Sequence, residues 1–238
     1  MSQFISPNLQ ESITQRFALI NNSFRTGVTP AAVVSCKDGI LLVTFNGHPR
    51  IPKIKQVGTG VAFVSVGEDR DRRRIYKAVL SNYLSNAYLI RSPGDPTIIE
   101  EIKDGMADVI AARFKDIFSS DYFSAEFILA SLGRNTKSDL MFKISFYGQV
   151  IDGGSVLLIP DILKNEDPSR KQKAIFEGVD FKQLDFRSSF KVVCPEVGVS
   201  SVLDGVEVVT LSREILISGN ENNVYHRLRH DEVKLWLE

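Results

Sequence analysis

The chain has 238 residues, of which 43% are hydrophobic, and this is enough to bury the core of one domain. Lys and Arg together number 29, as do Asp and Glu, so the formal net charge is zero and nothing favours a nucleic-acid partner. The two cysteines make no disulfide framework, which fits a reducing cytoplasm. The sequence also excludes a membrane span and a secretory signal, because no apolar run approaches about 18 residues and "MSQFISPNLQES" has no basic region before an apolar one.

The first third of the chain predicts a helix followed by strands. Ser6-Pro7 reads as an N-cap with proline in the first turn, and Gly27 ends a run of about five helical turns. Residues 31–36 and 40–45 predict a hairpin over Lys37-Asp38-Gly39, and residues 57–66 predict another strand. The apolar residues that give the helix its period are Leu9, Ile13, Phe17, Ile20 and Phe24.

The middle of the chain changes from a period of two to one of 3.6. Residues 75–84 predict an amphipathic helix, 92–96 a loop, and Thr97 with Glu100 a capping box that opens a second helix. Strands return at 124–132, 139–147 and 149–159. We expect the inner side of the second helix to carry Ile98, Ile102, Val109, Ile110, Phe114 and Ile117.

The last third is less regular. The segment "KNEDPSRKQK" is charged, and "FKQLDFRSSFKVV" has helical spacing until Pro195 interrupts it. Strands are expected near 206–211, 215–217 and 224–228, and "DEVKLWLE" predicts a closing helix capped by Asp231. The element order predicts an α+β fold: a four-layer αββα sandwich of two antiparallel sheets flanked by helices. We expect a single domain over 1–238, with a leading segment and helix over 1–26 and the sandwich over 27–238.

A charged run and the histidines have simple interpretations. "EDRDRRR" holds four arginines among three acids, and helical spacing pairs Glu68 with Arg72 and Asp69 with Arg73, which predicts a solvated, salt-bridged face. The alternative is that these charges contact another assembly of the chain, ring of copies against ring of copies. The three histidines are His48, His226 and His230, and no Cys or carboxylate at zinc-ligand spacing completes a set, so we predict no metal and no cofactor.

Four stretches in order resemble proteasome α-type subunits, above all the bacterial and archaeal ones. They are "FISP", "CKDGILLV", "PKIKQVGTGVAFVSVG" and "DEVKLWLE", and the resemblance covers residues 4–160 and 206–238. It implies the N-terminal-nucleophile hydrolase fold in its non-catalytic branch. Two features depart from the family pattern: Pro160-Asp161 replaces a glycine-rich turn, and Pro195 interrupts an expected helix. The helical layer built from 161–204 is therefore expected to differ.

The resemblance also implies a function. A chain of this kind forms a heptameric ring of identical copies that recruits catalytic β-type subunits, gates substrate access, and docks the C-terminal tails of a ring-shaped AAA ATPase or other activator in cytoplasmic protein degradation. Lys53 matches the lysine that pairs with the tail carboxylate, and Lys55 could share that role; a solvated or locally paired lysine is the alternative. The helix with Ile13, Phe17 and Ile20 is expected between neighbouring copies. The gate corresponds to Ser2, Gln3, Phe4, Ile5, Ser6 and Pro7, with a frayed terminus as the alternative.

Thr29 raises the competing hypothesis, a self-processing hydrolase of the same fold. A threonine nucleophile needs a free α-amine as base, so 28 residues would have to be removed, and it needs a nearby lysine and carboxylate. Self-processing members of the family usually carry glycine before the threonine, where this chain has Val28. The carboxylate position matches Phe45, whose ring cannot hold a proton. We therefore predict no catalytic residue.

Overall fold

The structure is a computed structural model, and it describes residues 7–27, 30–45, 52–89, 96–116, 121–159, 176–197, 205–219 and 223–237. Everything stated below about the structure concerns these residues. None of their helices is long and apolar enough to cross a membrane.

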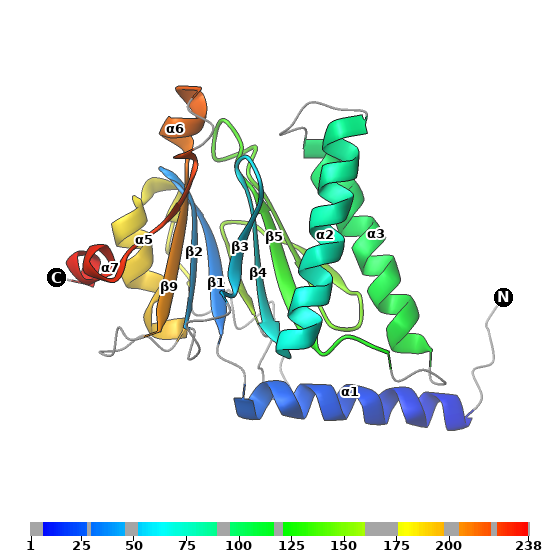
Figure 1. Ribbon diagram of the computed structural model, residues 1–238. Coiled ribbons are helices and arrows are strands. Elements are labelled where there is room, and N and C mark those ends of the chain that lie inside the picture. The colour runs from blue at the N-terminus through cyan, green and yellow to red at the C-terminus, as the bar shows by residue number, and fades with distance from the viewer. Residues whose placement is uncertain are drawn as a thin grey trace.

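Two antiparallel sheets form the centre of the molecule (Figure 1). The first has the order β10-β9-β2-β1-β8, with strands Tyr225–Arg227, Val206–Ser212, Gly39–Phe45, Ala31–Cys36 and Val156–Ile159. The second has the order β3-β4-β5-β6-β7, with strands Ile54–Gly58, Val61–Gly67, Ala125–Ser131, Leu140–Ile144 and Val150–Asp152. The α+β class with two antiparallel sheets is therefore confirmed.

Helices lie on the outer sides of both sheets (Figure 1). The pair α2 (Asp69–Leu89) and α3 (Pro96–Lys115) covers the second sheet. On the outer side of the first sheet lie α5 (Phe186–Val193), α7 (His230–Leu237) and the 3₁₀ turns Phe181–Gln183 and Pro195–Val197. The helix α1 (Pro7–Gly27) crosses one end of the sheets, and the short α6 (Arg213–Ile217) lies at the other end.

Three apolar clusters join the sheets to each other and to the helices on their outer sides. The cluster between the sheets joins Val33, Leu42 and Val209 to Ile54, Val64 and Ile128. A second cluster packs α2 and α3 on Phe63 and Phe127, and a third packs α5 and α7 on Val34 and Leu41. Because β1 and β2 are covered on both faces, nearly all their residues are buried, and this is why "AAVVSC" and "GILLVTF" read as continuous apolar runs.

The turn between β1 and β2 requires its glycine. Gly39 has a φ of 150°, and a Cβ there would lie 1.9 Å from the carbonyl oxygen of Leu211 in β9. A side chain would therefore separate β2 from β9 at the point where Gly39 pairs with Ser212.

Three of the expected strands are wrong. Residues 57–66 contain a turn: β3 and β4 form a hairpin closed by Gly60, whose φ is 66°, and the apolar pattern runs through it because Val57 and Val61 are both buried. Residues 149–159 form β7 and β8, which lie in different sheets because Gly153 and Gly154 break the segment. Residues 215–217 belong to α6.

Two helix expectations need correction. The buried stripe of α3 follows a spacing of four residues, so Val109 is exposed while Met106 is buried; Ile117 lies outside the described residues. The helix α7 begins at His230, so Asp231 lies inside it and is not the cap. Its start is instead closed by Glu232, whose carboxylate accepts from the backbone N–H of Arg229 at 2.7 Å.

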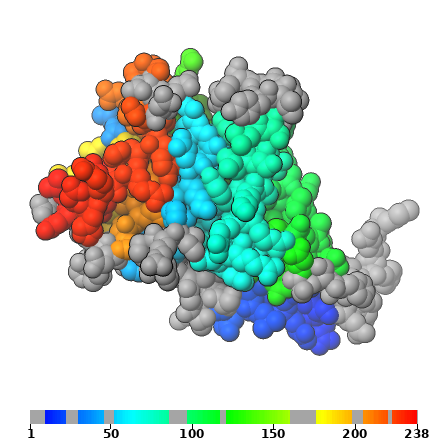
Figure 2. Space-filling view, viewed as in Figure 1, coloured from blue at the N-terminus to red at the C-terminus, as the bar shows by residue number. Residues whose placement is uncertain are grey.

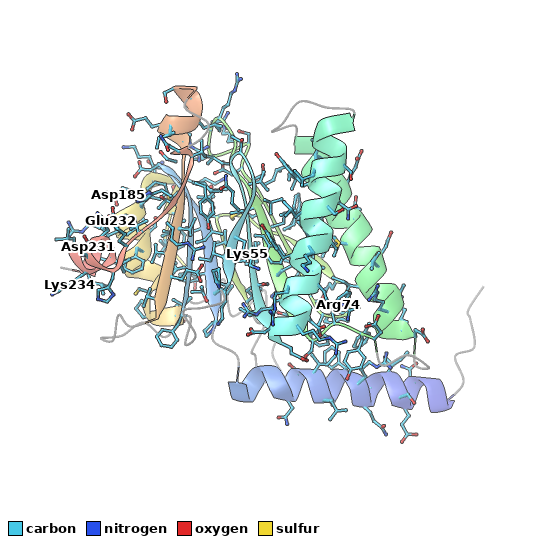
Figure 3. All side chains as sticks on the ribbon, viewed as in Figure 1. Lys55, Arg74, Asp185, Asp231, Glu232 and Lys234 are labelled. Atoms are coloured by element: carbon cyan, nitrogen blue, oxygen red, sulfur yellow. The ribbon has the colours of Figure 1, made fainter. Side chains whose placement is uncertain are left out.

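The charged run at the start of α2 is a solvated face only in part, with Glu68, Arg70 and Arg73 exposed. Asp71 and Arg72 are both buried, and Asp71 accepts from the backbone N–H of Ser124 at 2.8 Å. Arg72 pairs with Asp69, and Arg74 pairs with Asp121 at 2.7 Å near α1 (Figure 3). The run therefore attaches the first turns of α2 to the chain that leads into β5.

A buried ion pair joins the two sheets near the turn of the β1–β2 hairpin. The Arg213 guanidinium meets both oxygens of Asp139, at 3.0 and 2.8 Å, and Asp139 also accepts from Ser35 Oγ at 2.6 Å and the Gly133 N–H at 2.9 Å. Arg213 donates further to the carbonyl of Gly133 at 2.6 Å. Since each oxygen of Asp139 has two donors, the pair links β1, β6 and α6.

Asp139→Ala should lower the free energy of unfolding by about 3–5 kcal/mol, because it leaves a buried guanidinium without its counter-charge. Urea unfolding measures the effect. The matched control is Asp104→Ala, which removes a carboxylate that is 71% exposed and pairs with Lys103 at 3.4 Å. That change should stay within about 0.5 kcal/mol. Equal losses in the two variants would contradict the role given to the Asp139–Arg213 pair.

Candidate functional site

The site lies at the mouth of the β1–β2 hairpin, meaning the end where β1 begins at Ala31 and β2 ends at Phe45. Lys53 directly precedes β3 of the second sheet, but its contacts reach the first sheet. Its Nζ donates to the carbonyl oxygen of Phe45 at 2.9 Å, and its backbone N–H donates to Glu207 Oε2 at 3.0 Å. Lys53 therefore bridges the two sheets at this end.

Glu207 lies on β9, where it pairs in register with Thr44 of β2. Its second oxygen, Oε1, accepts from the backbone N–H of Ile54 at 3.1 Å and from Arg227 Nη1 at 2.6 Å. Arg227 on β10 also donates to the carbonyl of Ile54 at 2.7 Å. Both oxygens of this buried carboxylate are thus engaged by donors, and the network holds the start of β3 from two strands of the other sheet.

The surroundings of Lys53 lower the pKa of its ammonium group. The residue is only 8% exposed, and burial, followed by the positive charge of Arg72, lowers the pKa of Lys53 to about 8. The negative charges of Glu207 and Asp69 act in the opposite direction and raise it. Near neutral pH the group is therefore an ammonium whose charge depends on its neighbours from β9 and α2.

Lys55 lies on the outer side of β3, facing α2 (Figure 3). Its Nζ is 4.4 Å from the centre of the Tyr76 ring, and burial, then the charges of Arg72 and Arg73, lower the pKa of Lys55. Both lysines are thus close to the first turns of α2. Ile54, between them, is fully buried in the inter-sheet cluster, which confirms that its side chain faces the opposite way and holds the strand to the core.

The Lys53 ammonium points back onto its own chain. Because β2 ends at Phe45, the carbonyl there can accept, and the lysine folds onto it. A local partner for Lys53, the alternative weighed from the sequence, is therefore present. The use of Lys53 and Lys55 in binding a tail stays a prediction.

The helix α1 packs on its own chain. Ile20 is buried with Phe114 and Phe146, and the Phe17 ring lies 5.3 Å from that of Phe146. Phe17 stays 39% exposed, Ile13 is partly buried, and the most exposed large apolar side chain of the described helix is Leu19, at 68%. Aromatic residues of α3 and of the segment after β6 therefore cover part of the stripe of Ile13, Phe17 and Ile20, and its place between neighbouring copies stays a prediction.

Arg16 fixes α1 against the end of α3. Its Nη1 donates to the carbonyls of Phe114 at 2.8 Å and Asp116 at 3.0 Å, and its guanidinium lies 4.5 Å from the centre of the Tyr122 ring. A cation at the C-terminal end of a helix is favourable. Figure 2 shows α1 at one end of the molecule, beside the lower ends of α2 and α3.

Several predicted residues fall outside the described part of the chain. These are the gate residues Ser2 to Ser6, the candidate nucleophile Thr29 with Val28 before it, and Pro160-Asp161 with the charged segment that follows. Pro7 is the first residue of α1. Among the residues that the structure describes, no group of three His, Cys, Asp or Glu side chains could hold a metal ion.

Sequence reasoning missed Glu207 and Arg227. The signal was present in "GVEVVTLS", where a single carboxylate interrupts an apolar strand, because a buried charge needs a partner. The partners themselves come from β10 and from the backbone before β3, which no spacing in the sequence indicates.

Comparisons with known proteins agree with the motif resemblance. No protein-family model matches the chain. The chain is 23% identical over 212 residues to a protein named proteasome subunit alpha from Arthrobacter sp. FB24, covering 86% of this chain and 85% of that relative. These comparisons support the proteasome α-type family. Proteins of the same name from Pseudarthrobacter chlorophenolicus and Paenarthrobacter aurescens are each 26% identical over about half of either chain, covering 53% and 50% of this one and 52% and 49% of their own length.

Proposed function

We propose that the chain is a non-catalytic α-type subunit of a proteasome-like core particle, whose peptide cleavage is performed by β-type partners. The observation that carries the proposal is the position of Lys53 at the hairpin mouth, beside Phe45 instead of a catalytic carboxylate. The carboxylate nearby, Glu207, is engaged by two backbone N–H groups and Arg227, so it is committed to structure rather than proton transfer. The similarity to proteins named proteasome subunit alpha supports the same function.

The proposal also includes the fold. The fold would be a single-domain αββα sandwich of the N-terminal-nucleophile hydrolase type, and the apolar clusters on the outer sides of the two sheets support this. Under the proposal, residues 2–7 form the gate, which ends in the first residue of α1, in a cytoplasmic particle for protein degradation.

Thr29 should not act as a nucleophile. The alternative, a self-processing hydrolase, requires a chain that starts at Thr29 and a carboxylate near Lys53, and neither Val28 nor Phe45 supports it. Intact mass spectrometry of the purified chain should find Met1 or Ser2 at its start. A peptide epoxyketone, which reacts with both the hydroxyl and the free amine, should leave the mass unchanged. A species beginning at Thr29, or an adduct on it, would establish the hydrolase instead.

We propose that identical copies form a heptameric ring through α1. Leu19 supports this, because it is exposed beside a hollow lined by Ile20, Arg70 and Tyr122 that a neighbouring copy could fill. Ile13, Phe17 and Ile20 then stabilise the ring mainly by holding α1 in place, since much of their surface packs on the chain itself.

Leu19→Asp should convert the ring to smaller species without unfolding the subunit, whereas Phe17→Asp should disturb both. Each interface would lose about 1.5–3 kcal/mol of apolar burial and gain a charge. Native mass spectrometry measures the assembly, with and without a β-type subunit. The matched control is Ile217→Asp, at a side chain that is 64% exposed on α6 at the opposite end. If Leu19→Asp assembles as the wild type does, α1 is not the ring contact.

We propose that Lys53 receives the C-terminal carboxylate of an activator tail. The Lys53 ammonium donates to the Phe45 carbonyl, and an incoming carboxylate would meet a positive charge that burial has already removed from most of the water. Lys55 and Arg72 add positive charge on the α2 side. The site therefore suits a single anionic end group better than a polyanion.

Lys53→Ala should weaken binding of a peptide that ends in an aromatic residue with a free carboxylate. Loss of a charge-assisted hydrogen bond costs about 1.5–3 kcal/mol, or roughly ten- to a hundred-fold in affinity. Amidating the peptide should cost the wild type a comparable amount and the variant little, because both changes remove one contact. Fluorescence anisotropy measures all four combinations. If amidation weakens binding equally in the wild type and in Lys53→Ala, another residue holds the carboxylate, and Lys55→Ala would be measured next.

A further inference from the structure

The backbone at Lys53 is held in an unusual way for the start of a strand. The N–H groups of Lys53 and Ile54, neighbours in the chain, both donate to the side chain of Glu207, which belongs to the other sheet. Only a carboxylate in this orientation offers an acceptor to each N–H, since an amide would set its own NH₂ group against one of them. The negative charge of Glu207 is therefore part of the geometry of Lys53.

Arg227 holds Glu207 in turn. It donates to Glu207 Oε1 at 2.6 Å, to the Ile54 carbonyl at 2.7 Å and to the Tyr225 hydroxyl at 3.1 Å. It thereby closes a ring of contacts through Glu207 and Ile54 that does not include the Lys53 side chain. Arg227 supports the position of Lys53 through the two residues that it fixes, Glu207 and Ile54.

We propose that Glu207, held by Arg227, is the positioning residue of the Lys53 site, which keeps the ammonium charged and in place at the hairpin mouth so that the site can recognise a carboxylate. The recognition half rests on the proposed tail docking. The positioning half concerns Lys53 alone and can be tested without any tail.

The charges around Lys53 give the proposal a direction. Glu207 from β9 and Asp69 from α2 favour the ammonium, while burial and Arg72 from α2 oppose it, and together they leave the pKa of Lys53 at about 8. Only the protonated form attracts a carboxylate, so recognition is present below this pKa and is lost as pH rises through it. Removing the charge of Glu207 should move the loss to lower pH, and removing that of Arg72 should move it to higher pH.

The variants separate charge from position. Glu207→Gln keeps the length of the side chain and removes its charge, whereas Glu207→Asp keeps the charge and shortens the reach toward the two N–H groups. Arg227→Ala leaves the carboxylate and removes its support. Glu214→Gln, at an exposed carboxylate of α6, is the matched control for a lost charge.

The first measurement is the ratio of affinities for the free-acid peptide and its amidated twin, from about pH 6 to about pH 10. In the wild type we expect a ratio of roughly ten or more at neutral pH that falls toward one above the lysine pKa. Glu207→Gln should reduce the ratio and lower its midpoint, Glu207→Asp should reduce the ratio with a smaller shift, and Glu214→Gln should change neither. Arg227→Ala should reduce the ratio, with no further loss when combined with Glu207→Gln.

The second measurement follows Lys53 itself without a peptide, by NMR of protein labelled at lysine Nζ, with the signal assigned by Lys53→Arg. Glu207→Gln should lower the titration midpoint, and Arg72→Gln should raise it. If the wild type binds the free-acid and amidated peptides equally well, the tail-docking function and the recognition half are both wrong. The titration midpoints of Lys53 would still decide the positioning half. Unchanged midpoints in Glu207→Gln overturn the proposal. If that variant does not fold, wild-type ratios in both Glu207→Asp and Arg227→Ala overturn it.

Discussion

The face-to-face packing of the two sheets is the constraint on which the other features depend. With helices on their outer sides as well, β1 and β2 are buried on both faces, and the two ionic networks described above lie where these strands end. The register of β2 with β9 sets those ends: Gly39 pairs with Ser212, and Phe45 pairs with Val206. Arg213 follows directly at one end and Glu207 lies at the other, so two buried ionic networks join the sheets at opposite ends of the same strands.

The two ionic networks differ in the partners of their charged groups. At the turn end, the charges of Asp139 and Arg213 face each other directly, and the remaining partners are backbone groups and one serine hydroxyl. At the mouth end, Glu207 and Arg227 satisfy each other and the backbone, while the ammonium of Lys53 donates to the backbone carbonyl of Phe45. A hydrogen bond to a neutral carbonyl leaves the positive charge of an ammonium in place.

The sequence predicts features that repeat along the chain and misses those that depend on single distant contacts. The five helical turns of α1 and the β1–β2 hairpin were both correct, because each rests on several residues at one spacing. The β3–β4 turn was missed because its apolar residues keep their pattern across Gly60. A motif identified Lys53, but it did not predict the hydrogen bond from the Lys53 ammonium to the Phe45 carbonyl, because that bond depends on where β2 ends. Glu207 contacts Lys53 across 154 residues of chain, and Arg227 contacts Ile54 across 173.

A lysine at the hairpin mouth serves two kinds of chemistry, and the residue at the end of β2 decides between them. Beside a carboxylate, its proton could move to and from a nucleophile, so that it would assist catalysis. Beside Phe45, no side chain there can take the proton, and the ammonium instead donates to the backbone carbonyl of that residue. Burial and Arg72 then hold its pKa at about 8, low enough for its neighbours to set its charge. Under the proposed function, the loss of one carboxylate changes a catalytic group into a recognition group, while the strand pairing around it stays the same.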